Sequence, residues 1–241
     1  MSTLGSDSTH PWSHPSDEAS TLSRLEKRLA ILLSIIAGMV DLIGFLTLGN
    51  IFTAHITGNL VVIAAVLVRG GPLNPAQALS IPVFILAVAA TWLSARVSGR
   101  HGSGLARLLL LGQFLLLAAV LMFGVISHPS ADPRGLMAGI AVMIAVSAMA
   151  CQFALLRLAV PGAPSTAVMT GNLTNTVLSL LDVLSQREPL RNGAAQRLKT
   201  SLGLLVGFLL GCVVAAAAVS LMGDWAWSFP LALAGVAVCL R

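Results

Sequence analysis

Residues 37–62 read AGMVDLIGFLTLGNIFTAHITGNLVV, an apolar stretch with one acid, Asp41, and a Thr-Gly-Asn motif near its end. A helix that crosses a bilayer needs about 20 mostly apolar residues. Residues 29–48 meet that requirement, whereas the segment that starts at the motif, residues 57–68, is too short for it. The stretch therefore predicts a membrane span followed by a short apolar segment with a polar beginning.

The composition of the whole chain favours a membrane protein. Hydrophobic residues make up 56% of the 241 residues and charged residues only 10%, whereas soluble domains carry about 25% charged residues. So few charges cannot cover a water-exposed surface, which argues against a soluble enzyme. The net charge of +5 is typical of Lys and Arg in cytoplasmic loops. No basic run with interleaved aromatic residues and no metal-site spacing of Cys and His occurs, so we expect neither a nucleic-acid partner nor a metal.

The remaining apolar segments predict an all-α integral membrane protein. We expect six full transmembrane helices, at residues 29–48, 76–97, 105–126, 136–160, 202–222 and 225–240. Two further segments, residues 57–68 and 170–184, are short or polar. Such segments are tolerated at membrane depth only inside protein or along a cavity, so we expect two short or re-entrant segments there.

The distribution of basic residues favours re-entrant segments. Residues 1–28 are predicted to be a disordered tail, and the basic cluster at its end keeps that tail in the cytoplasm. If the two short segments are re-entrant, 12 of the 14 Lys and Arg residues lie inside and only Arg69 and Arg134 lie outside. If all eight segments span, ten lie inside and four outside. The first topology fits the positive-inside rule better, and eight spans remain the alternative.

The Thr-Gly-Asn motif occurs twice in the same context. TAHITGNL (53–60) and TAVMTGNL (166–173) match at six of eight positions and lie 113 residues apart. Each copy follows one long span and precedes another, so we expect a two-fold internal repeat of residues 29–128 and 129–241. Three full spans in each half make the repeats inverted, which we prefer, and four make them parallel. Inverted repeats with broken helices recur in secondary transporters.

The two motifs supply the candidate substrate-binding residues. A half-helix that begins at Thr-Gly-Asn, with Thr or Asn as N-cap, would direct free backbone N–H groups and the positive end of its dipole into the membrane. Two such ends that meet near the midplane would favour an anion. The alternative is that the motifs only cap and pack helices. The predicted substrate-binding residues are Thr57, Gly58, Asn59, Thr170, Gly171, Asn172 and Gln152.

Asp41 is the candidate for coupling to a proton or ion. An acid inside a membrane span is costly and usually faces a cavity or a partner. A paired structural acid is the alternative. Gln152 occupies the equivalent region of the second half, and both side chains would face one axis if the halves are pseudo-symmetric. His55 could titrate near neutral pH, but a single histidine is no constellation, so we expect it to line an interface or cavity without a proton role.

The same residues carry a family resemblance. Gly38, Asp41 and Phe45, then Phe52 and the Thr-Gly-Asn motif, resemble the opening signature of the YoaK-type bacterial integral membrane proteins, a domain-of-unknown-function family. The second half resembles the family through Gln152 and its own Thr-Gly-Asn, although Cys151 stands where a glycine is typical. The similarity covers about residues 30–240. It implies a multi-pass protein of the bacterial inner membrane and adds little about activity.

These features together predict a secondary transporter or channel for a small solute, anionic or proton-coupled. No catalytic signature occurs in the sequence, so we expect no enzyme, no catalytic residues and no cofactor. A structural or assembly protein without transport is the first alternative, and an intramembrane enzyme is the second. The expected partners are the lipid bilayer and the solute, with a homo-oligomer left open.

Overall fold

The computed structural model describes residues 24–160, 162–185 and 190–241, and every regular element in them is a helix. Predictions for residues 1–23 lie outside the described residues. The last residues of the expected tail are helical instead, because α1 begins at Arg24 and extends its apolar run outward with charged side chains. The helices are α1 (Arg24–Thr47), α2 (Ile56–Arg69), α3 (Pro75–Ser98), α4 (Gly102–Ser127), η2 (Pro129–Ala131), α5 (Leu136–Leu158), α6 (Met169–Leu184), α7 (Leu190–Met222), η3 (Gly223–Trp227) and α8 (Ser228–Cys239).

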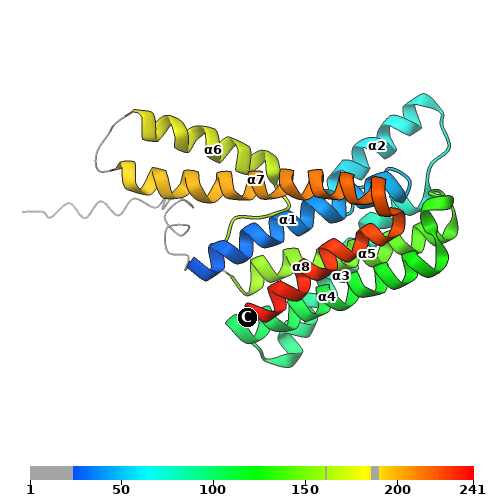
Figure 1. Cartoon of the computed structure of the whole chain (residues 1–241), viewed down its shortest axis with the longest axis horizontal. Coiled ribbons are helices and arrows are strands. Elements are labelled where there is room, and N and C mark those ends of the chain that lie inside the picture. Colours follow the sequence, from blue (N-terminus) through cyan, green and yellow to red (C-terminus); the bar gives the residue numbers. More distant parts are fainter. Residues whose placement is uncertain (1–23, 161, 186–189) are drawn as a thin grey trace, which may run out of the picture.

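The long helices coincide with the apolar segments of the sequence. Within the described residues, five helical stretches are long and apolar enough to cross a membrane, namely α1, α3, α4, α5 and the stretch Gly193–Cys239. The last stretch holds α7 and α8, which meet at the short 3₁₀ turn η3. Figure 1 shows α8 turning back from the end of α7. The multi-pass helical class is confirmed, and the count of six spans stays a prediction.

Local signals set the ends of these helices. α3 begins where the side chain of Asn74 accepts a hydrogen bond from the backbone N–H of Ala76 at 3.0 Å, with Pro75 in the first helical position. Both features are typical of a helix start, because an N-cap oxygen satisfies a free N–H and proline has none to lose. α3 ends at Gly99, whose φ of 59° lies in the left-handed region that glycine adopts without strain.

The core of the molecule is built around α1 and α5. α1 packs on α7, α8 and α5, and α5 packs on α3 and α4. The contact between α1 and α7 is unusually close, because a Cβ built on Gly38 would overlap the carbonyl oxygen of Phe208 and one built on Gly211 would overlap that of Ile35. Small residues at such a crossing let two membrane helices approach backbone to backbone. Ser34 adds a hydrogen bond across the same interface, from its Oγ to the carbonyl oxygen of Leu204 at 2.7 Å.

The two short helices lie at the edge of this core. α2 has 14 residues and packs on α3, and α6 has 16 residues and packs on α7. At about 1.5 Å per residue, neither covers the roughly 30 Å of a hydrocarbon core. In Figure 1 the two helices diverge toward opposite ends of the molecule. Each is reached through a non-helical loop, residues 48–55 before α2 and 159–168 before α6, of which Pro161 is not described.

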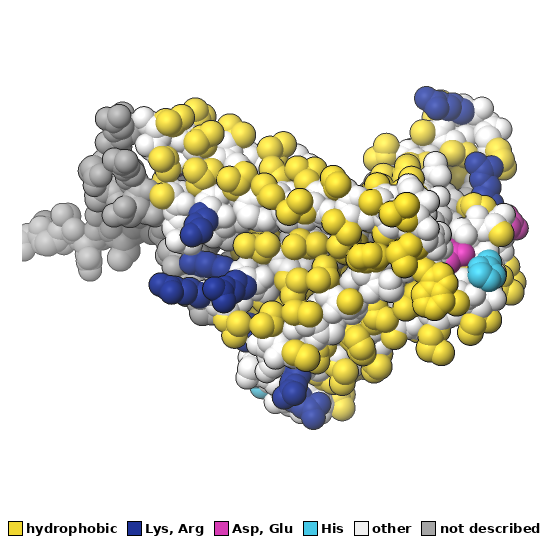
Figure 2. Space-filling model, in the orientation of Figure 1, with side chains coloured by type: hydrophobic (Ala, Val, Ile, Leu, Met, Phe, Trp, Pro, Cys, Tyr) yellow, Lys and Arg dark blue, Asp and Glu magenta, His cyan; other side chains and the backbone are white. Residues whose placement is uncertain are grey.

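Charged side chains gather at the ends of the helix bundle. Figure 2 shows Lys and Arg concentrated toward the end where α1 begins and at the α3–α4 turn, with few at the opposite end. Hydrophobic side chains cover the face between these ends. That distribution is the one expected of a bundle whose sides face lipid and whose ends face water.

Candidate functional site

Asp41 holds the loop that leads into α2. The side chain projects from α1 and is 5% exposed. Its Oδ1 accepts backbone N–H bonds from Thr53 and Ala54, each at 2.8 Å, and from His55 at 3.3 Å. The hydroxyl of Thr53 donates to the carbonyl oxygen of Val40 at 3.0 Å, so a second bond ties the loop to the same turn of α1. The carboxylate therefore satisfies consecutive buried N–H groups just before a helix begins, where negative charge is favoured.

His55 pairs with this acid. Its Nδ1 lies 2.8 Å from Oδ2 of Asp41, and its side chain is 28% exposed against 7% for the acid. The imidazole stands edge-on to the ring of Phe208 in α7, with 5.2 Å between the ring centroids. No pattern in the sequence joins Asp41 to His55, because the two residues are 14 positions apart and lie in different elements. The premise that this histidine stands alone is therefore wrong, whereas its expected lack of a proton role stays a prediction.

Asn59 clamps the same loop from the other side. Its Oδ1 accepts the backbone N–H of Phe52 at 2.9 Å, and its Nδ2 donates to the carbonyl oxygen of Phe52 at 2.8 Å. The same Nδ2 donates to Oγ of Ser80 in α3 at 3.0 Å. The side chain is fully buried. Asn59 therefore joins the loop, α2 and α3, and its amide is engaged in the fold.

The second half has a similar clamp. Nδ2 of Asn172 donates to the carbonyl oxygen of Ser165 at 2.9 Å, seven residues upstream as in the first half. Gln152 in α5 bonds the loop before α6, as Asp41 in α1 bonds the loop before α2. Its Nε2 donates to Oγ1 of Thr166 at 3.1 Å and to the carbonyl oxygen of Leu33 at 2.9 Å. Its Oε1 accepts a bond from Gln113 at 2.7 Å, so a buried amide network joins α1, α4, α5 and the loop.

The threonines of the two motifs do not cap the short helices. α2 begins one residue before Thr57 and α6 one residue before Thr170, and the N-cap positions, His55 and Val168, make no side-chain capping bond. Both threonines are exposed, unlike the buried asparagines two residues later. The N-cap prediction is therefore wrong for Thr57 and Thr170. The polar side chain that bonds the loop is instead the asparagine of each motif, which reaches the backbone seven residues upstream.

The glycines of the motifs sit against the same loops. A Cβ on Gly58 would lie 2.9 Å from the ring of Phe52, and one on Gly171 would lie 3.2 Å from a methyl group of Val168. Both contacts are closer than a side chain ordinarily allows. In each motif the threonine is therefore exposed, the glycine packs closely against a residue of the preceding loop, and the asparagine holds that loop through hydrogen bonds.

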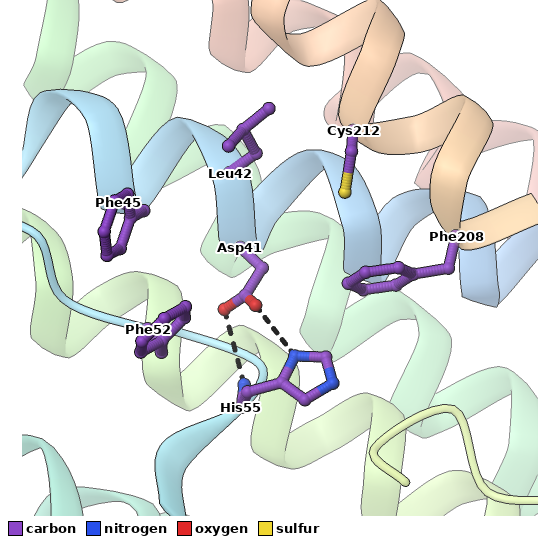
Figure 3. Close-up of a pocket in the computed structure, with 7 residues that line it drawn as sticks. All are labelled: Asp41, Leu42, Phe45, Phe52, His55, Phe208 and Cys212. Carbon is purple, nitrogen blue, oxygen red and sulfur yellow. Dashed lines mark hydrogen bonds and ion pairs between the residues drawn. The ribbon is translucent and has the colours of Figure 1, made fainter. Parts of the chain in front are cut away.

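A pocket of about 380 Å³ opens beside the Asp41–His55 pair. Figure 3 shows the acid and the imidazole pointing at each other, with Phe45 and Phe52 to one side and side chains of α7 to the other. The volume falls within the range of about 300–1,000 Å³ typical of small-molecule sites. The residues that line it are Asp41, Leu42, Phe45, Phe52, His55, Phe208 and Cys212.

The pocket brings together only part of the predicted site. Asp41 lines it, whereas Gln152 and the residues of both Thr-Gly-Asn motifs do not. A role of those residues in solute binding stays a prediction. Phe45 and Phe52 stand in the quoted signature, but nothing in the sequence pointed to Phe208, which α7 supplies. Among the described residues, no group of three His, Cys, Asp or Glu side chains could hold a metal ion.

Comparison with known proteins places the chain among membrane proteins. A family model described as "Protein of unknown function (DUF1275)" matches residues 29–240. A stretch of 43 residues is 46% identical to the "UPF0700 transmembrane protein YoaK" of Bacillus subtilis (strain 168), which is 18% of this chain and 19% of the relative. The match therefore spans about a fifth of the length of that relative. No solved structure matches the chain.

Proposed function

Since the chain belongs to the DUF1275 family, we propose that it is a multi-pass protein of the cell inner membrane that moves a small solute across the bilayer. The membrane location rests on the family, on the transmembrane relative and on the apolar helices. The observation that carries the transport function is the pocket at the Asp41–His55 pair. It lies next to a loop that interrupts helical structure and precedes a helix too short to span. Non-helical backbone at membrane depth is typical of transporter sites.

We propose six spans and two inverted repeats. The packing supports this, because α1 packs on α7 and α8 as α5 packs on α3 and α4, and α2 packs on α3 as α6 packs on α7. These pairs correspond when α1, α2, α3 and α4 are matched in order with α5, α6, α7 and α8. The directions of the helices support it too. In Figure 1, α2 and α6 each run back toward the end of the molecule at which the preceding long helix finished.

The hydrogen bonds support the same correspondence. Asn59 and Asn172 each donate to a carbonyl oxygen seven residues upstream, and Asp41 and Gln152 each bond the loop that follows their own helix. Equivalent bonds at equivalent positions are the expected consequence of a duplicated unit. In the proposed topology α2 enters from one side of the membrane and α6 from the other.

The proposed orientation places the N-terminus in the cytoplasm. The starts of α1, α4 and α7 and the ends of α3 and α5 carry most of the described Lys and Arg residues, whereas Arg69 and Arg134 lie at the other end. Lys and Arg near span ends are retained in the cytoplasm. A reporter enzyme fused after Arg100 should therefore read as cytoplasmic, and one fused after Gly71 as periplasmic. A periplasmic reading after Arg100 would favour eight spans instead.

Transport is tested with the purified full chain in vesicles of phosphatidylethanolamine and phosphatidylglycerol. Stopped-flow light scattering would follow solute entry after an osmotic step with glycerol, potassium acetate or choline chloride, which are neutral, anionic and cationic probes. We expect at least one probe to enter faster than it enters protein-free vesicles. Equal rates for all three would contradict transport of small solutes and favour the structural alternative, in which the two asparagines serve only to brace the fold.

The native cysteines provide a test of whether the solute pathway passes through the pocket. Cys212 lines the pocket, whereas Cys239 is exposed elsewhere and Cys151 is buried. In a variant that keeps only Cys212, N-ethylmaleimide should fill the pocket and remove most of the flux. In a matched variant that keeps only Cys239, the same reagent should leave the flux unchanged. Mass spectrometry would verify labelling in both, and full flux through a labelled Cys212 variant would place the pathway elsewhere.

A further inference from the structure

We infer that the pocket beside Asp41 takes a small organic cation, and that a proton on His55 would oppose its binding. The inference rests on the proposed function and names the class of solute. It departs from the anion that the helix dipoles suggested in the sequence. The reason is that the groups at the pocket are a carboxylate and aromatic rings, while the motif residues do not line it.

Three of the seven lining residues are phenylalanines. Phe45 and Phe52 lie with their ring centroids 5.0 Å apart on one side, and Phe208 of α7 lies on the other. The face of such a ring is negative, so a cation within about 6 Å of a ring centroid is attracted to it. Quaternary ammonium groups are recognised in proteins by clusters of aromatic rings. Neutral apolar solutes also fit apolar walls, so the charge at the pocket has to distinguish a cation from a neutral solute.

The charge at the pocket is negative. Of the titratable side chains on α1, the loop before α2 and α7, those that line it are Asp41, His55 and Cys212, and the neighbouring α5 and α8 contribute none. No Lys or Arg is among the lining residues, and the described partner of Asp41 in an ion pair is His55. With a neutral imidazole, the acid that lines the pocket has no cationic side chain beside it, and a charge acts more strongly in a low-dielectric setting than in water.

His55 supplies the competing cation. A proton on the imidazole places a positive charge 2.8 Å from Oδ2 of Asp41 and beside the ring of Phe208. The same acid and the same ring would stabilise an ammonium group in the pocket. Because one carboxylate balances one positive charge, binding of an organic cation and protonation of His55 disfavour each other. If His55 lost its proton on one side of the membrane when the cation bound, and regained a proton on the other side when the cation left, the movement of the cation and the movement of the proton would be coupled.

The test compares two ligands of nearly equal shape. Choline and its neutral isostere 3,3-dimethylbutan-1-ol would be titrated by calorimetry into the full chain in a maltoside detergent, which contains no choline. We expect choline to bind at least about tenfold more tightly at about pH 8, because only choline carries charge for the acid and the rings. Its affinity should fall about tenfold or more by about pH 5, where imidazoles hold a proton.

Variants separate the contributions. Phe208→Leu keeps the wall apolar but removes the ring, and should weaken choline about three- to thirtyfold. Phe229→Leu, on the exposed surface of α8 and outside the pocket, should leave it unchanged. Asp41→Asn keeps an oxygen for the loop N–H groups and should abolish the preference for choline over its isostere. His55→Gln should keep that preference and lose its pH dependence.

Equal binding of the two ligands, or binding of neither, to the wild-type protein would overturn the inference. Weakening by Phe229→Leu as large as that by Phe208→Leu would overturn the assignment to this pocket. The outcomes also separate this inference from the proposed function. Choline binding without flux of any probe would support the cation site and contradict transport. Flux of glycerol or acetate without choline binding would support transport and contradict the cation site.

Discussion

Replacing Gly211 with alanine is expected to destabilise the folded protein by about 3 kcal/mol or more, at the upper end of the range for overpacked sites. The added Cβ would overlap the carbonyl oxygen of Ile35 and lie 3.1 Å from both the carbonyl carbon of Ile35 and the backbone nitrogen of Met39. These are backbone atoms of a helix, so no side chain can turn aside to make room. α7 and α1 would have to separate along their whole contact. Thermal unfolding in detergent, followed by circular dichroism, measures the loss.

Gly104 in α4 provides the matched control. The nearest atoms to a Cβ built there are carbons of Arg100 at 4.0 Å. Gly104→Ala should therefore leave stability unchanged or raise it by up to about 1 kcal/mol, because alanine favours a helix over glycine. Equal melting temperatures for the Gly104 and Gly211 variants would show that the close approach of α1 and α7 contributes nothing to stability.

Asp41→Ala should release the loop before α2 and cost about 3–5 kcal/mol. The substitution removes the acceptor of three backbone N–H bonds and the partner of the His55 imidazole, and leaves the N–H groups of Thr53 and Ala54 buried without that acceptor. Amide hydrogen exchange of residues 53–55 should accelerate more than exchange in α1, since the loop depends on the acid and the helix does not. Asp41→Asn should restore most of the protection, because the amide oxygen can still accept these bonds.

Asp182 in α6 serves as the control acid. It is 57% exposed and lies 3.6 Å from Arg197, an ion pair that solvent screens. Asp182→Ala should change stability by less than about 1 kcal/mol. If Asp41→Ala proved no more costly than Asp182→Ala, the loop would have to be held by Asn59 and Thr53 alone.

The sequence predicted the helices well because length and hydrophobicity are local properties. Runs such as residues 105–126 have one stable conformation in a bilayer, a helix with all backbone bonds satisfied internally. The unusual status of Asp41 was also predictable, because an acid in such a run is costly wherever the helix packs. The position of the short segments followed from their polarity and from the repeated motif.

The sequence could not predict what those residues touch. The pairing of Asp41 with His55 depends on a loop returning to α1, and the contribution of Phe208 depends on α7 packing there from the far half of the chain. The error about Thr57 has a similar origin, since an N-cap rule considers one turn of helix and not the bracing bond from Asn59 to Phe52. The bond from Gln152 to Leu33 likewise joins residues more than a hundred positions apart.

The two loops are fastened by different chemistry. The carboxylate of Asp41 ties the loop before α2 to α1, and the neutral amide of Gln152 ties the loop before α6 to α5 through the hydroxyl of Thr166. The acid can carry a charge, whereas the amide carries none. The two loops are therefore alike in the asparagine that braces each of them, but the side chain that ties each loop to the preceding helix differs in charge.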